Sequence, residues 1–171
     1  TAGGAITVDT TVSSANLTTS AAGDIDVDET DGLILKGVTA TGNLDVVASG
    51  SITQSGVIDV DGSASFTAGA NVITLTNVSN DFTGALSLSN SGSNAVSLKD
   101  ADDITLGTVS VGDALTLTAI NGSINDASDD KVADITAGGL ITLTARDEIG
   151  GVVAANTTDT AGAIEFASGS N

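Results

Sequence analysis

The sequence contains no histidine, cysteine, tryptophan, tyrosine, methionine or proline, and only four of its 171 residues are Lys or Arg. Without histidine the chain has no ordinary proton shuttle near neutral pH, and without cysteine it has no thiolate nucleophile, disulfide or zinc–thiolate site. The plentiful serine and threonine hydroxyls therefore have no histidine base to activate them. We expect a protein that is not an enzyme and that has no catalytic, cofactor-binding or metal-binding residues.

Cationic charge is scarce beside anionic charge, because four Lys and Arg oppose 22 Asp and Glu and give a formal net charge of −18 at pH 7. Such a surface repels phosphate backbones and anionic lipid head groups, so we expect no nucleic-acid partner and no membrane insertion. No run of 18 apolar residues could span a bilayer. Because even an initiator methionine is missing, we expect the sequence to be a mature piece or an excerpt of a longer chain.

Helix-forming residues are also scarce, since 19 of the 22 acids are Asp and the straight-chain residues Glu, Lys, Arg, Gln and Met are almost absent. The chain is nevertheless 40% hydrophobic, with 15% charged residues and a mean hydropathy of +0.30, which is enough apolar surface for a folded domain. Abundant Gly, Thr, Ser, Asn and Asp favour strands and turns. The composition therefore predicts an all-β protein.

Short apolar–polar–apolar triplets recur along the whole chain. Each has the period-two pattern of a strand of about four or five residues with one buried face. Gly, Asn, Asp or Ser separates nearly every pair of triplets, which marks a turn about every eight to eleven residues. The triplets are Ile6–Val8, Ile25–Val27, Leu44–Val46, Ile58–Val60, Ile73–Leu75, Leu86–Leu88, Val96–Leu98, Ile104–Leu106, Leu115–Leu117 and Ile141–Leu143.

A longer, 71-residue repeat is superimposed on this pattern. Residues 24–52 match residues 95–124, with one extra residue near the end of the second copy. The positions that agree between the copies are apolar and inward, whereas outward positions differ, as where Asp45 is replaced by Thr116. The repeat therefore preserves a core rather than a surface.

These spacings predict a parallel β-solenoid. A 71-residue unit with about nine short strands divides into three coils of roughly 24 residues with three strands each. About seven such coils fit residues 1–171 as a single segment, and at roughly 4.8 Å between strands they form a rod about 34 Å long. Two β-sandwich domains are the alternative, because strands eight to twelve residues apart are also typical of sandwiches.

Four segments carry a family resemblance: residues 51–56 (SITQSG), 62–69 (GSASFTAG), 80–84 (NDFTG) and 112–119 (GDALTLTA). They resemble the repeats of filamentous-haemagglutinin-like exoproteins, which are very large secreted bacterial adhesins of the two-partner-secretion type. The resemblance covers most of residues 20–150. It implies a right-handed parallel β-helix in an extracellular fibre or stalk, secreted or associated with the cell surface.

The densest acidic run of the sequence precedes Gly32 and superficially resembles an oxygen-ligand loop for calcium. Alternation places its first three Asp residues on one strand face, about 7 Å apart. The second copy replaces them with neutral or basic residues, so a solvated acidic face that binds calcium weakly at most is favoured over a specific site. The run is Asp24, Asp26, Asp28, Glu29 and Asp31, and its counterparts include Ala95, Ser97, Lys99 and Asp102.

A second group of acids falls in predicted turns, where Asp side chains bond their own backbone. The stretch 125–134 breaks the triplet rhythm and is therefore the expected protruding loop, where we expect at most weak cation binding. The acids of this group are Asp100, Asp102, Asp103, Asp126, Asp129 and Asp130.

The sequence thus predicts a structural role, as a stalk or fibre segment of a secreted bacterial adhesin or extracellular matrix filament. Unpaired strand edges at the terminal coils invite end-to-end stacking, so the expected partners are other copies of the chain or neighbouring repeats of a longer one. The alternative function is a calcium- or glycan-binding module of a cell-surface adhesin, with a host surface or glycan as its partner.

Overall fold

The structure is a computed structural model that describes residues 2–127 and 134–150, and in these ranges it contains strands and turns but no helix. The strands are β1 (Ile6–Thr10), β2 (Ser14–Thr18), β3 (Ile25–Glu29), β4 (Leu33–Ala40), β5 (Leu44–Ala48), β6 (Ile52–Gln54), β7 (Ile58–Val60), β8 (Ala64–Thr67), β9 (Ile73–Leu75), β10 (Asp81–Phe82), β11 (Ala85–Ser89), β12 (Val96–Asp100), β13 (Ile104–Val111), β14 (Leu115–Ala119), β15 (Ile124–Asp126), β16 (Ile135–Ala137) and β17 (Ile141–Ala145). All ten predicted triplets lie in these strands.

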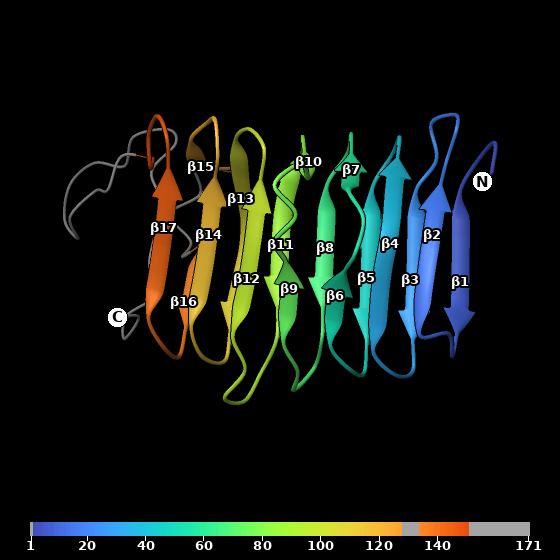
Figure 1. The fold of residues 1–171 in the computed structure, drawn as a ribbon, viewed down its shortest axis with the longest axis horizontal. Helices are drawn as coiled ribbons and strands as arrows, with labels where there is room; N and C mark the ends of the chain where they lie inside the picture. Colours follow the sequence, from blue (N-terminus) through green and yellow to red (C-terminus); the bar gives the residue numbers. More distant parts are fainter. Residues whose placement is uncertain (1, 128–133, 151–171) are drawn as a thin grey trace.

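The strands form two sheets that lie one behind the other, and in each sheet successive coils stack side by side from β1 to β17 (Figure 1). One sheet follows the order β1-β3-β5-β8-β11-β13-β15, with β16 also paired to β13. The other follows β10-β7-β4-β6-β9-β12-β14-β17, with β2 also paired to β4. The chain is therefore a β-solenoid of about six turns, close to the predicted seven coils.

Every pair of neighbouring strands is parallel. This arrangement confirms the predicted solenoid and excludes the sandwich alternative, whose sheets are antiparallel. Seven strands succeed one another along the first sheet, so their six intervals of about 4.8 Å span roughly 29 Å.

The predicted coil length of roughly 24 residues is wrong. Ile25 lies opposite Leu44 and Leu44 lies opposite Ala64, so the chain returns to the same position after fewer residues than predicted. One reason lies in β4, which continues as a single extended strand of eight residues, Leu33–Ala40, instead of turning partway along. The next coil pairs with its two halves separately, through β6 and β7. The strands of each coil therefore fall on two sides, one in each sheet.

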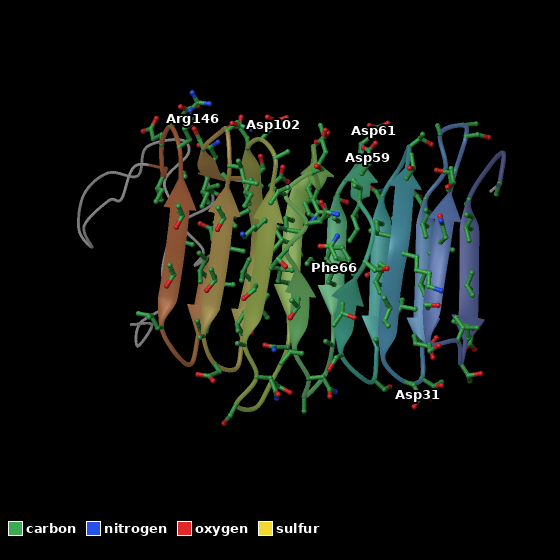
Figure 2. The ribbon with its side chains drawn as sticks, in the orientation of Figure 1. Asp31, Asp59, Asp61, Phe66, Asp102 and Arg146 are labelled. Atoms are coloured by element: carbon green, nitrogen blue, oxygen red, sulfur yellow. The ribbon has the colours of Figure 1, made fainter. Side chains whose placement is uncertain are left out.

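Because a coil is shorter than predicted, the 71-residue repeat corresponds to three and a half coils. The three full coils run from β3 to β11, and the half coil runs on to β12 in the other sheet. Equivalent strands of the two copies consequently lie in opposite sheets. Figure 2 shows the same relation at the turns, where Asp31 and its equivalent Asp102 lie at opposite edges of the stack.

The core is a continuous stack of aliphatic side chains between the two sheets. On the first sheet, Ile25, Leu44 and Ala64 occupy the same position in successive coils, and all are 1% exposed. Phe66 lies near the middle of the stack (Figure 2). Its ring meets that of Phe82 edge to face, with the ring centroids 6.0 Å apart. Alternation along each strand therefore supplies one inward side chain per coil at each position.

Glycine recurs at one corner of the coil, shortly before the strands of the first sheet. A Cβ on Gly62 would lie 2.7 Å from both the carbonyl carbon and the carbonyl oxygen of Gly42 in the preceding coil. The backbones of successive coils are thus too close at this corner for any side chain. Gly4, at the start of the series, has nothing within 4 Å of the corresponding position. The series is Gly4, Gly23, Gly42, Gly62 and Gly84.

Candidate functional site

The predicted acidic face lies on the outside of β3. Asp26 and Asp28 alternate with the buried Val27 and point away from the core, as the alternation predicts. Asp26 lies opposite Asp45 of β5, so like charges face each other between neighbouring coils. Within residues 2–127 and 134–150, no three acidic, histidine or cysteine side chains are grouped so that they could hold a metal ion.

Two acids of the candidate groups bond the following coil rather than stand free in solvent. The Oδ1 atom of Asp24 accepts a hydrogen bond of 2.7 Å from the backbone N–H of Asn43. The Oδ1 atom of Asp103 accepts one of 2.6 Å from the backbone N–H of Ser123. The prediction that Asp103 bonds its own local backbone is therefore wrong, because in a solenoid the next coil offers the nearer donor.

Glu29 is turned inward and is only 3% exposed, although it belongs to the run of acids that was predicted as a surface feature. Its Oε1 atom accepts a hydrogen bond of 3.2 Å from the backbone N–H of Asp31. Its Oε2 atom is buried without a partner. Burying a carboxylate oxygen without a hydrogen-bond partner is unfavourable, so the unpaired Oε2 atom of Glu29 lowers the free energy of unfolding.

Asp100 is the counterpart of Glu29 in the second copy of the repeat, and it is completely buried. Its Oδ1 atom accepts a hydrogen bond of 2.9 Å from the backbone N–H of Asp102, which confirms the predicted bond to its own turn. Its Oδ2 atom accepts one of 3.0 Å from the N–H of Phe82 in the preceding coil. Burial nevertheless raises the pKa of Asp100 to about 6, since desolvation outweighs the two donors.

This raised pKa predicts a pH dependence of stability. The folded chain binds more protons than the unfolded chain between the ordinary pKa of 3.8 and about 6, so the free energy of unfolding falls as pH rises through this window. Between pH 5 and pH 7.5 the contribution of Asp100 is roughly 1 kcal/mol, and Asp100→Asn should remove it.

Urea denaturation at the two pH values measures the difference. Asp28→Asn, which removes a charge from the outer face, is the control and should leave most of it. Retention of the full difference by Asp100→Asn would contradict the assignment.

Asn80 forms a buried polar cluster with Gln54 that the sequence analysis did not identify as a site. The Oδ1 atom of Asn80 accepts hydrogen bonds from Gln54 Nε2 at 2.9 Å and from the backbone N–H of Ile58 at 3.1 Å. Its Nδ2 atom donates to Gln54 Oε1 at 3.0 Å and to the carbonyl oxygen of Lys99 at 3.1 Å. The cluster satisfies backbone groups where β6 and β7 leave a gap in the sheet, so its role is structural.

The remaining candidates that lie in the described part of the chain form no cluster able to hold a metal ion. Asp102 lies in a turn at the edge of the stack, and Asp126 ends β15. Asp129 and Asp130, with residues 128–133 of the predicted loop, lie outside the described residues. In the described part of the chain there is no helix long and apolar enough to cross a membrane.

Comparison with known proteins gives a repeat family but no function. No curated protein and no solved structure is significantly similar to this chain. A family described as repeats of unknown function (DUF5649) matches twice, over residues 22–89 and residues 93–156. The two matches contain the two copies that the 71-residue offset relates, and together they cover well over half of the sequence. The chain belongs to the DUF5649 family of repeats of unknown function.

Proposed function

We propose that this chain is a structural segment of a bacterial extracellular fibre, either the stalk of a secreted adhesin or a matrix filament. The observation that supports this proposal is the continuity of the fold, in which one apolar core and two parallel sheets run the length of the segment. Backbone hydrogen bonds join each coil to the next, so tension along the stack would load many ladder bonds together. Such a rod suits spacing and display rather than catalysis.

The charge distribution supports a rod that stays separate from its lateral neighbours. Like charges face each other on adjacent coils, with Asp26 opposite Asp45 and Asp59 opposite Asp81. Partial burial and the neighbouring Asp81 and Asp61 carboxylates raise the pKa of Asp59. The outer faces thus repel other anionic surfaces, which favours solubility and discourages side-to-side aggregation. The resemblance of four segments to filamentous-haemagglutinin-like repeats supports the extracellular location.

Immunogold electron microscopy of intact cells of the encoding organism tests the location and the form. Antibodies against this segment should label filaments outside the cell, and an external protease should remove the label. Label that appears only after permeabilisation would contradict an extracellular role.

Calorimetric titration with calcium chloride separates the scaffold from the binding-module alternative. A scaffold should give no saturable heat, whereas a stoichiometric heat would identify a calcium-binding module.

A further inference from the structure

Within residues 2–127 and 134–150, the apolar core is incompletely covered at the two ends of the stack. Among the described residues, β1 pairs only with β3, β2 only with β4, and β17 only with β14. Seven apolar residues pack against the core while remaining partly exposed, and all of them lie in the first coil or the last. They are Ile6, Ala15, Leu17, Ile141, Leu143, Ala145 and Ile149.

The repeat shows what each open edge would pair with. Strands β2 and β11 are equivalent in the repeat. Strand β2 pairs with the eight-residue strand β4, β11 pairs with its counterpart β13, and both pairings have a register shift at the same point. Both members of each pair are displaced by the same 71-residue offset between the copies. The pairs are Ser14/Ile34, Ala15/Leu35, Leu17/Val38 and Thr18/Thr39 in the first copy, and Ala85/Thr105, Leu86/Leu106, Leu88/Val109 and Ser89/Ser110 in the second.

Strands β17 and β8 are equivalent in the same way. Strand β8 lies on β5, and β17 lies on β14, which is the counterpart of β5 in the second copy. The matching pairs are Leu44/Ala64 and Val46/Phe66 in the first copy, and Leu115/Ile141 and Leu117/Leu143 in the second.

In the middle of the solenoid β8 and β11 pair with each other, with Ala64 opposite Leu86 and Phe66 opposite Leu88. Their equivalents β17 and β2 are the strands that, among the described residues, have one unpaired edge at the two ends. We propose that a second copy of this chain docks head to tail on the first, with its β2 paired in parallel to β17. The register transferred from β8 and β11 places Ala15 opposite Ile141, Asn16 opposite Thr142, Leu17 opposite Leu143 and Thr18 opposite Thr144.

The side chains of this junction are complementary in size and charge. The internal pair joins a small residue, Ala64, to a large one, Leu86, and the junction joins the large Ile141 to the small Ala15. The outward pairs are Asn16 with Thr142 and Thr18 with Thr144, which are uncharged although the chain carries a net charge of −18. The junction therefore covers apolar surface at both ends without placing two carboxylates opposite each other.

On the other sheet the incoming β1 competes with Ile149. Strand β1 is equivalent to β9, since Ile6 lies opposite Ile25 as Ile73 lies opposite Val96. Strand β9 pairs with β6, and the equivalent of β6 in the second copy is β15. There the place is held by one isolated bridge between Ile124 and Ile149, with hydrogen bonds of 2.8 and 2.7 Å. Docking exchanges this bridge for β1 and adds the β17–β2 ladder.

Sedimentation equilibrium of the 171-residue chain tests the docking, which rests on the proposed function because it gives the fibre its end-to-end contact. The average mass should rise with concentration, and more so with added salt, because salt screens the repulsion between copies. Leu17→Asp and Leu143→Asp should each weaken association more than about a hundredfold by burying an unpaired carboxylate. Far-UV circular dichroism checks that both variants remain folded.

A mixture of these two variants separates head-to-tail docking from other contacts. Leu17→Asp keeps an intact β17 and Leu143→Asp keeps an intact β2, so together they should form one-to-one dimers and nothing larger. The control Val47→Asp changes a residue that is 38% exposed on the outer face of β5 and should associate like the unmodified chain. An unmodified chain that stays monomeric at millimolar concentration, or a mixture that stays monomeric, would overturn the proposal.

Disulfide formation tests the register, because the chain has no cysteine of its own. Asn16→Cys mixed with Thr142→Cys should cross-link at least about tenfold faster than Asn16→Cys mixed with Thr144→Cys, since neighbouring positions on one strand face are about 7 Å apart. Equal rates would overturn the register. Monomeric protein that is still displayed on cells would overturn the docking alone, whereas oligomers without surface display would overturn the proposed function alone.

Discussion

Replacing Gly62 by alanine should lower the free energy of unfolding by about 3 kcal/mol or more, because the added methyl group has no room. Its Cβ would lie 2.6 Å from Asn43 Oδ1 and 2.7 Å from the backbone of Gly42. The N–H of Gly62 donates to the carbonyl oxygen of Gly42 at 3.0 Å, so the two coils cannot separate without losing this ladder bond. Asn43 also accepts hydrogen bonds from the backbone N–H and the hydroxyl of Ser63, and it would be displaced as well.

Gly4→Ala is the matched control for this substitution, since Gly4 begins the same glycine series and has nothing within 4 Å. It should change stability by less than about 0.5 kcal/mol, the usual range for a surface substitution. Urea denaturation followed by far-UV circular dichroism measures both variants. Similar losses in the two would show that the methyl group acts through the chain's conformational freedom and not through contact between coils.

Replacing Phe66 by alanine should lower the free energy of unfolding by about 3 to 5 kcal/mol, as for other large-to-small changes at buried aromatic residues. Phe66 has no exposed surface and lies between Val46 and Leu88 in the ladder of the first sheet. Its ring also meets that of Phe82 edge to face at 83°. The substitution would leave a cavity in the core near the middle of the stack. Coils packed on both sides hold the backbone there in place, so the cavity cannot be filled by the ends of the stack.

Phe66→Leu is the control, because it keeps most of the buried volume and should lose only about 1 kcal/mol. Denaturation must again be followed by circular dichroism, since the chain has neither tryptophan nor tyrosine as a fluorescent reporter. A loss for Phe66→Ala no larger than for Phe66→Leu would mean that neighbouring coils collapse into the space.

The fold class could be predicted from the sequence because the inward positions alternate so regularly, but the length of the coil and its division between two sheets could not. Residues 33–35 and 38–40 give the same pattern whether the chain bends between them or continues straight, and in β4 it continues. Weak strands such as β2 and β10 also escaped prediction. Their own propensities are low, and they form because a neighbouring coil supplies the hydrogen-bonding partners.

The candidate site was predictable in part. The outward acids of β3 follow from alternation, and the same parity places Glu29 inward after Ile25 and Val27, a signal that the sequence analysis did not use. Asp100 follows Leu98 in the same way. The cluster of Asn80 with Gln54 could not be derived from spacing, because the two residues meet only through the gap between β6 and β7. Both lie in segments that carry the family resemblance.

A repeat of three and a half coils has a geometric consequence for any longer array of these units. Each unit adds about 17 Å along the axis and faces the opposite way from the unit before it. A group attached to every unit would therefore appear alternately on the two flanks, and those on one flank would be about 34 Å apart. Gain or loss of a single unit would turn everything beyond it through half a revolution, so the parity of the repeat number decides which flank the distal end presents.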